Sequence, residues 1–112
     1  MTEKDKLRSE IDELKHEIEN IDELRQKIES IDNEMRSLFE SRMRVAKKIG
    51  LYKKEKGIPV KDEKREEFLI KKNLSGLSDV SLKEFYAEFQ KCVIGLSCEY
   101  QEKVIKGEGT GK

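Results

Sequence analysis

The feature that most constrains this chain is an apolar side chain at every third or fourth position from residue 7 to residue 52, interrupted once by an arginine. Steps of three and four residues place all of these side chains on one face of a helix. We call this face the apolar ladder. It consists of Leu7, Ile11, Leu14, Ile18, Ile21, Leu24, Ile28, Ile31, Met35, Leu38, Arg42, Val45, Ile49 and Tyr52. The ladder predicts one very long N-terminal helix, from about residue 4 to residue 56.

A helix of that length cannot bury its apolar face within a chain of 112 residues. At a rise of about 1.5 Å per residue it would measure roughly 75–80 Å, which exceeds the diameter of a globule of this size. Charged residues make up 43% of the chain against 35% hydrophobic residues, and proline occurs once, as in long solvated helices with a narrow apolar seam. The sequence therefore predicts an all-α fold in which a partner chain covers the ladder.

The charge balance excludes several classes of protein. Lysine plus arginine and aspartate plus glutamate both number 24, so the net charge is zero. A nucleic-acid partner is not expected, because it would select a basic stripe. No apolar run is long enough to span a membrane, and the N-terminus is charged from Glu3 onward, unlike a signal peptide. We expect a cytoplasmic protein in which Cys92 and Cys98 are free, at least half-buried thiols.

Two breaks divide the rest of the chain. Gly57-Ile58-Pro59-Val60 ends the first helix, because proline lacks a donor and favours extended geometry before it. Asp62 is the expected N-cap of a short second helix that ends at residues 73–76. The segment Ser81-Leu82-Lys83-Glu84 predicts a capping box that opens a third helix. Three helices per chain are therefore expected, with residues 1–20 extending the first helix and residues 106–112 forming a flexible tail.

Polar side chains interrupt the apolar faces of the first and third helices or gather at the start of the second. Taken singly, each fits a side chain at the edge of a seam that extends to water. Together, cations on inward faces would repel one another without an anion between them, so the set predicts a polyanionic ligand. The set consists of Arg25, Arg42, Lys53, Asp62, Arg65, Glu66, Ser97 and Gln101.

Three segments in this order resemble the all-helical class of chorismate mutases, over about residues 21–104. They are Leu24-Arg25-x-x-Ile28-x-x-Ile31-Asp32, Leu38-x3-Arg42-x2-Val45-x3-Ile49-x2-Tyr52-Lys53 and Gly57-Ile58-Pro59-Val60-x-Asp62-x2-Arg65-Glu66. The resemblance implies a chorismate mutase domain over residues 21–105, within an intertwined homodimer of three-helix chains with shared active sites. It also implies conversion of chorismate to prephenate without a cofactor, in phenylalanine and tyrosine biosynthesis.

The resemblance assigns the two carboxylates and the ether oxygen of chorismate to five of these residues. Arg42 would bind one carboxylate, and Arg25 of the other subunit would bind the second, because a guanidinium grips a carboxylate with two hydrogen bonds. Ser97 would donate to a carboxylate oxygen. Lys53 and Gln101 would donate to the ether oxygen, where negative charge develops as the C–O bond breaks.

The remaining three residues belong to the first turn of the expected second helix. By the same resemblance, Glu66 would accept a hydrogen bond from the ring hydroxyl, with Asp62 at the same end. Arg65 would add positive potential near a carboxylate. An amide at Gln101 donates without being protonated, so no strict acid optimum is expected.

Other interpretations of the sequence remain open. A non-catalytic coiled-coil dimerisation or regulatory module explains residues 7–38 equally well, but not the inward Arg42, Lys53 and Gln101. The segment from Gly107 to Lys112 is one residue short of a phosphate-binding loop, and no strand precedes it. Members of the resembled family are often fused to another shikimate-pathway enzyme, so fusion or association with one is a further expectation.

Overall fold

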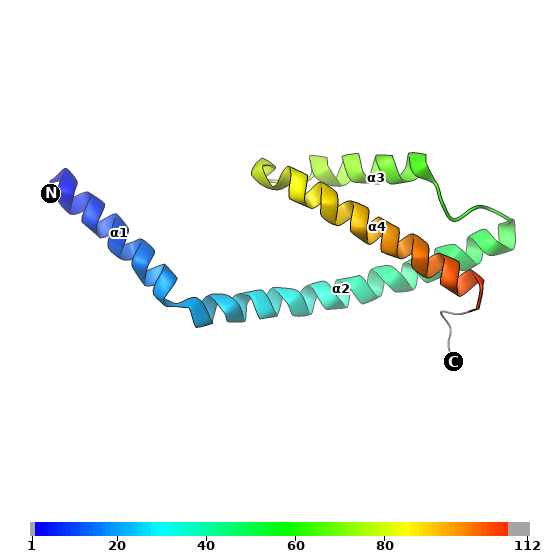
Figure 1. The fold of residues 1–112 in the computed structure, drawn as a ribbon, viewed down its shortest axis with the longest axis horizontal. Helices are drawn as coiled ribbons and strands as arrows, with labels where there is room; N and C mark the ends of the chain where they lie inside the picture. The colour runs from blue at the N-terminus through cyan, green and yellow to red at the C-terminus, as the bar shows by residue number, and fades with distance from the viewer. Residues whose placement is uncertain (1, 108–112) are drawn as a thin grey trace. The chain divides into compact units, whose positions relative to one another are not determined.

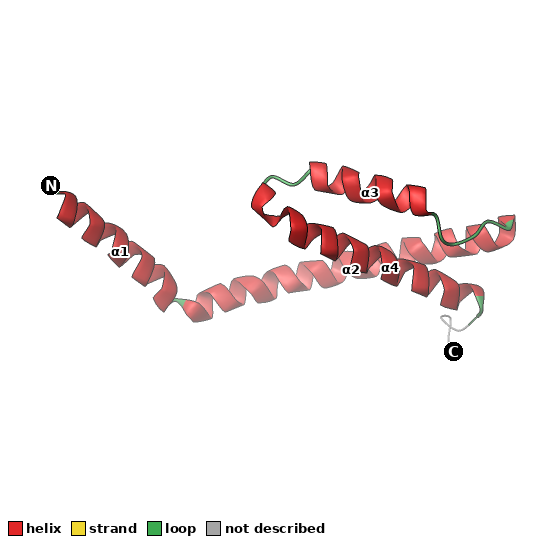
Figure 2. Ribbon diagram, turned by 45° about the horizontal axis from the view of Figure 1, so that its top comes forward, coloured by secondary structure: helices red, strands yellow, loops and turns green. Residues whose placement is uncertain are grey.

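The computed structural model describes residues 2–107, except for the side chains of residues 17–19, and this part of the chain is helical without strands (Figure 2). The helices are α1 (Glu3–Glu19), α2 (Ile21–Lys56), α3 (Glu63–Ser75) and α4 (Lys83–Ile105), with a short 3-10 helix η1 (Val80–Leu82) before α4. Figure 1 follows them along the chain. The all-α class is confirmed. The five residues from 108 onward, on which most of the predicted tail and the weak phosphate-loop pattern fall, lie outside the described residues.

The prediction of three helices with a single long first helix is wrong, because α1 ends at Glu19 and α2 begins at Ile21. Between them, Asn20 has φ −95° and ψ 47°, which is not helical. The ladder explains the position of the break. From Ile18 to Leu24 it takes two successive steps of three residues, and such a shift moves an apolar stripe around a continuous helix. Asparagine also competes for backbone hydrogen bonds and favours helix ends.

The chain divides into two compact units, Met1–Phe39 and Glu40–Lys112. The first unit contains α1, whose N-cap Thr2 forms a reciprocal capping box with Asp5, and the first part of α2. Its described ladder side chains are exposed, from 41% at Leu24 to 69% at Leu38. Within the first unit, these side chains are therefore not covered.

The second unit contains the rest of α2 together with α3, η1 and α4, and α3 runs alongside α4 (Figure 1). Its buried residues are Ala46, Gly50, Val60, Gln90, Ile94, Ser97, Gln101 and Val104. On α2 the buried face is Ala46 and Gly50, whereas Val45 and Ile49 of the ladder are exposed. A Cβ on Gly50 would lie 3.1 Å from Cβ and Cγ of Gln101, so the missing side chain lets α2 and α4 approach closely.

The predicted start and end of the second helix are confirmed in α3. The Asp62 carboxylate accepts from the backbone N–H of Arg65 at 3.0 Å, and Gly76 is the C-cap. The predicted capping box at Ser81 is wrong. Asp79 accepts from the backbone N–H of Ser81 at 3.0 Å and from its hydroxyl at 2.6 Å, so Asp79 caps η1 instead. These hydrogen bonds lower the pKa of the Asp79 carboxyl.

Two further expectations concern the cysteines and the membrane. Cys92 and Cys98 are free thiols as predicted, but Cys92 is exposed and only Cys98 is half-buried. The prediction that both are at least half-buried is therefore wrong for Cys92. Among residues 2–107, no helix combines the length and the apolar character that crossing a membrane requires.

Candidate active site

A cavity of about 410 Å³ opens in the second unit, between α2, the loop before α3, α3 and α4. Its size lies within the range of small-molecule sites, about 300–1,000 Å³. The lining residues are Arg42, Val45, Ala46, Ile49, Lys53, Val60, Asp62, Arg65, Glu66, Leu69, Ile94, Ser97, Cys98 and Gln101. Seven of the eight residues singled out from the sequence are therefore brought together around one space.

Arg25 is the eighth residue, and it lies in the first unit. Its guanidinium is 3.8 Å from the Asp22 carboxylate, and both side chains are largely exposed. An exposed ion pair of this kind contributes little to stability. The guanidinium of Arg25 is therefore available to another partner at small cost.

Arg42 and Ser97 form one side of the cavity. Nη1 of Arg42 donates to Oγ of Ser97, across the space between α2 and α4. Ser97 is buried, whereas Arg42 is exposed in the single chain. A guanidinium has five N–H donors in a planar fork, so this contact fixes the orientation of Arg42 and leaves donors for a ligand.

Lys53 is held by the loop that follows α2. Its Nζ donates to the carbonyl oxygen of Val60 at 2.8 Å, and its own carbonyl accepts from the backbone N–H of Ile58, also at 2.8 Å. Gly57 permits this path, because its φ of +68° is a conformation that side chains disfavour. The ammonium group keeps further donors for the cavity.

Gln101 presents a buried amide to the cavity. The residue is buried, and its Oε1 has no hydrogen-bond partner among the described residues. A buried polar group without a partner costs about 1–3 kcal/mol. Since the oxygen and nitrogen of an amide are assigned from their contacts, a turn of the amide would equally present its N–H groups. Either way, a polar ligand in the cavity would satisfy Gln101.

Glu66 is held from two sides by residues that the sequence analysis did not single out. Nζ of Lys61 lies 3.0 Å from its Oε1, and the Cys98 thiol donates weakly to its Oε2, with Sγ at 3.8 Å. The hydrogen bond and charge of Glu66 raise the pKa of the Lys61 ammonium group. Burial, and then the charge of Glu66, raise the pKa of the Cys98 thiol. The carboxylate is therefore oriented before any ligand enters.

Asp62 and Arg65 lie at the first turn of α3. Asp62 uses one carboxylate oxygen to cap the helix, and the guanidinium of Arg65 lies 5.2 Å from the ring centre of Phe68. Both residues are exposed. In this exposed position, the charge of Arg65 can attract an anion at long range, whereas the carboxylate of Asp62 serves the helix cap.

The sequence analysis assigned no role in the site to three further residues. Cys98 lines the cavity, Lys61 pairs with Glu66, and Gly50 lies against Gln101. A glycine inside a helix is destabilising by about 0.5–1 kcal/mol relative to alanine, so Gly50 could have been interpreted as a point of close helix packing. Lys61 and Cys98 lie among many lysines and apolar residues, and no periodicity marks them.

The charged lining suits an anion. Three cations and two carboxylates face the cavity, which gives a net charge of +1. The walls between them are apolar, from Val45, Ile49, Leu69 and Ile94. Charges in such a partly apolar cleft interact more strongly than in water. The arrangement can bind and orient a small anionic molecule.

The chain is thus an all-helical protein with a cavity whose charged lining is cationic on balance. The family model described as chorismate mutase type II matches residues 24–102, and the chain belongs to this family, the all-helical class of chorismate mutases. The resemblance stated from the sequence is thereby confirmed. Searches of curated proteins and of solved structures found no match.

Proposed function

We propose that this protein is a chorismate mutase enzyme, which converts chorismate to prephenate as a homodimer with shared active sites. Membership of the family supports the activity. The single observation that carries the proposal is the cavity in which Arg42, Lys53, Glu66 and Gln101 surround one apolar space. Chorismate is a small dicarboxylate with a ring hydroxyl and an ether oxygen. One carboxylate, the hydroxyl and the ether oxygen each have a complementary side chain among these four residues.

The reaction needs positioning and electrostatic stabilisation. An ether C–O bond breaks while a C–C bond forms within the same molecule, without a nucleophile or a proton transfer. The protein therefore lowers the barrier by holding the compact conformer and by stabilising charge at the departing oxygen. We assign the donors at that oxygen to Lys53, which Val60 orients, and to the buried Gln101.

The carboxylates are assigned to two arginines. Arg42, oriented by Ser97, binds one of them. Arg25 precedes Arg42 by seventeen positions, and residues that far apart on one helix are separated by about 25 Å of rise, too far to grip one small molecule. We therefore assign the second arginine at each site to the other copy. Its charge would raise the net charge from +1 to +2, which balances a dianion.

The other end of the substrate is assigned to Glu66 and to the residues around it. The carboxylate accepts the ring hydroxyl, and its orientation by Lys61 and Cys98 reduces the loss of side-chain freedom on binding. Asp62 lies at the same end, and Arg65 adds positive potential at the rim.

Complementation between two inactive variants tests both the activity and the shared site. Arg25→Ala chains and Arg42→Ala chains are each expected to lose turnover of chorismate, followed by its absorbance. When the two are mixed and allowed to exchange subunits, one site in each mixed dimer receives both arginines. Activity should then recover to about a quarter of the wild-type value, since half of the dimers are mixed and each has one intact site.

The outcomes of this experiment separate the two parts of the proposal. Recovery supports the shared site. Absence of recovery after confirmed subunit exchange would overturn it, while an active wild type would still support the enzyme. A wild-type chain without turnover at micromolar concentration would overturn the enzyme itself, in favour of a dimerisation module. Lys27→Ala, next to the ladder but outside the cavity, is the matched control and should retain activity.

A further inference from the structure

Helix α1 lies outside the matched residues 24–102, and neither the cavity nor the proposed reaction uses it. Its apolar side chains Leu7, Ile11 and Leu14 are all exposed. We propose that α1 of each copy docks on the second unit of the other copy, in an apolar groove beside the substrate cavity. This docking rests on the proposed function, because it requires the homodimer with shared active sites.

The groove lies at the C-terminal end of α2. Its volume is about 400 Å³, and it shares Val45, Ile49 and Lys53 with the substrate cavity. Tyr52 and Ile58, which line only the groove, are exposed in the single chain. Neither α3 nor α4 contributes to the lining, so within the second unit the groove is an uncovered apolar surface of the kind that binds a partner. The lining residues are Val45, Lys48, Ile49, Tyr52, Lys53 and Ile58.

The arrangement of the proposed homodimer brings α1 to this groove. Arg25 and Arg42 lie on the same helix, and each meets the other arginine of the second copy at a shared site. The two α2 helices therefore run antiparallel, and their α1 helices lie at opposite ends of the dimer. Each α1 thus meets the second unit of the other copy rather than the other α1.

The spacing along the chain agrees with this arrangement. Leu14 precedes Arg25 by eleven positions, and Tyr52 follows Arg42 by ten positions. Each span corresponds to about 15 Å of helix, so Leu14 of one copy comes level with Tyr52 of the other. Asn20 is the one non-helical residue within the first span, so the apolar face of α1 stays within reach of the groove.

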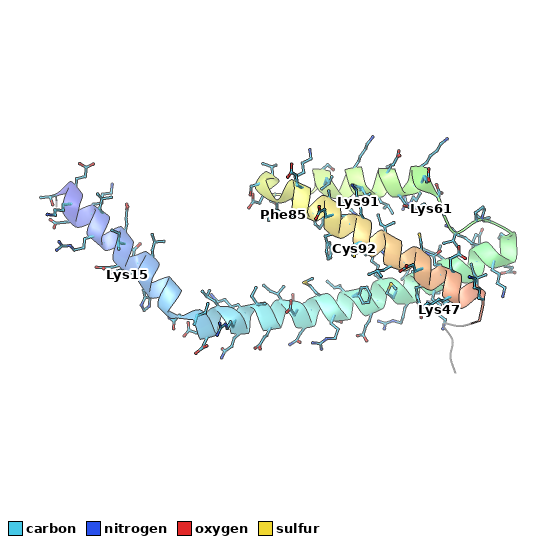
Figure 3. The ribbon with its side chains drawn as sticks, viewed as in Figure 1. Lys15, Lys47, Lys61, Phe85, Lys91 and Cys92 are labelled. Carbon is cyan, nitrogen blue, oxygen red and sulfur yellow. The ribbon has the colours of Figure 1, made fainter. Side chains whose placement is uncertain are left out.

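The net charges of the two segments are opposite. Helix α1 carries seven acidic and four basic residues, which gives a net charge of −3 with His16 neutral. Residues 47–56 of α2, which begin at Lys47 (Figure 3), carry five lysines and one glutamate, a net charge of +4. None of these lysines forms an ion pair within the described part of the chain. Charge complementarity therefore favours α1 as the segment that fills the groove.

Docking of α1 excludes water from one side of the substrate cavity. Lys53 lines both the groove and the cavity, and its ammonium group is assigned to the ether oxygen of the substrate. Charges interact more strongly where water is excluded. A covered groove therefore strengthens the contact of Lys53 with the substrate, and α1 completes the wall of the other copy's site.

Cross-linking in the full-length chain tests the docking. In a Cys92→Ser, Cys98→Ser background, Leu14→Cys is combined with Lys56→Cys. Position 56 borders the groove, because Nζ of Lys56 is 5.9 Å from the ring centre of Tyr52. The two cysteines cannot meet within one chain, since about 50 Å of helix lies between residues 21 and 56. A short bismaleimide should therefore link two copies.

The matched control for this cross-link is His16→Cys combined with Lys56→Cys. Position 16 is exposed and lies on the face of α1 opposite Leu14. The Leu14→Cys variant should be linked at least tenfold faster, and mass spectrometry of the peptides should show links between positions 14 and 56. Equal rates in the two variants, or links mainly between two copies of position 14, would overturn the docking.

Failure of the docking can be told apart from failure of the shared site. Complementation of Arg25→Ala by Arg42→Ala needs no contact of α1 with the groove. Recovered activity without links between positions 14 and 56 would therefore overturn the docking alone. Absence of both the recovery and the links would overturn the shared site as well.

The reactivity of a cysteine in the groove provides a second test. In the same background, Ile58→Cys is the reporter, and its rate of reaction with iodoacetamide is measured. Leu14→Asp should raise this rate about tenfold, because a charge replaces a leucine buried against the groove. His16→Asp adds the same charge on the opposite face and should leave the rate unchanged. Equal rates with Leu14→Asp and His16→Asp would overturn the docking.

Discussion

The two compact units use the same apolar ladder differently. In the first unit the described ladder side chains, such as Ile28 and Ile31, are exposed, and none of them lines the cavity. In the second unit Arg42, Val45 and Ile49 of the ladder form one wall of a cavity. Apolar periodicity alone does not distinguish a surface that awaits another chain from the wall of a binding site. The polar residues that accompany it make the distinction.

Packing within the second unit uses a neighbouring face of the same helix. Ala46 and Gly50 are buried, while Val45 and Ile49 beside them remain exposed. The buried apolar core is small, with Ala46, Val60, Ile94 and Val104. An exposed apolar stripe of this length marks an interaction surface. We therefore expect the first unit to provide assembly and the second to provide chemistry.

The largest effect is expected on dimerisation, when a charged residue replaces an apolar ladder residue of the first unit. Burying an isoleucine contributes about 1.5–3 kcal/mol, and a symmetric dimer buries each ladder residue twice. Ile31→Asp should therefore weaken dimerisation by about 10²–10⁴-fold, which light scattering would detect as a halved mass, and turnover should fall with it. Ser30→Asp adds the same charge beside the ladder and should remain dimeric. A monomeric wild type would contradict the division of roles.

Removal of Arg42, the ladder arginine in the second unit, should strongly lower the enzymatic activity while the dimer persists. Loss of one donor to a developing or bound anion typically costs about 3–4 kcal/mol of barrier, so Arg42→Ala should lower kcat/KM by about 10²–10³-fold. The helical circular dichroism and the mass should be unchanged. Arg36→Ala is the control, since the guanidinium of Arg36 donates to Asn33 on the same helix and does not line the cavity. Preserved activity of Arg42→Ala would refute the site.

The close approach of α2 and α4 should be sensitive to a single methyl group. Gly50→Ala would place a Cβ 3.1 Å from Gln101, and overpacking typically costs about 1–3 kcal/mol. We expect a lower Tm and, because Gln101 is displaced, a lower kcat. Gly95→Ala is the matched control, since its Cβ would meet nothing within 4 Å, and helix propensity predicts a small gain in stability. A stabilised Gly50→Ala would show that the helices are not packed at this point.

Much of this architecture could be predicted from local signals in the sequence. Asp62 and Gly76 mark the ends of α3 because capping chemistry acts over three or four residues. Arg42, Ser97 and Gln101 could be singled out because a polar residue on an apolar face is visible from spacing alone. Their convergence on one cavity follows from the order of the helices, which the resemblance supplied.

The features that were not predicted depend on neighbouring residues that compete for the same hydrogen bond, on a shift in the apolar repeat, or on contacts between segments distant in sequence. Asp79 takes the hydroxyl of Ser81 that the predicted capping box would have used. The break at Asn20 follows from a shift in heptad phase that a count of apolar residues does not show. The pairing of Lys61 with Glu66 depends on the path of the loop after Pro59, and the contact of Cys98 with Glu66 joins residues 32 positions apart.

The smallest predicted effect is a difference in the rate of alkylation between Cys92 and Cys98, which lie on the same helix. Cys92 is exposed, whereas Cys98 lines the cavity and its pKa is raised above the ordinary value of 9.0. Only the thiolate is alkylated. Iodoacetamide should therefore label Cys98 more slowly than Cys92 at pH 7.5. Below its pKa, the rate at Cys98 should rise about tenfold per pH unit.

A ligand bound in the cavity provides a control for the comparison of the two labelling rates. Chorismate or a dicarboxylate analogue should slow the labelling of Cys98 several-fold, because the ligand covers the thiol and the adjacent Glu66. The rate at Cys92 should not change, since that side chain lies on the exposed part of α4 (Figure 3). Mass spectrometry of the two peptides measures both rates in one sample. Equal labelling of the two thiols, with and without ligand, would mean that Cys98 does not line the substrate site.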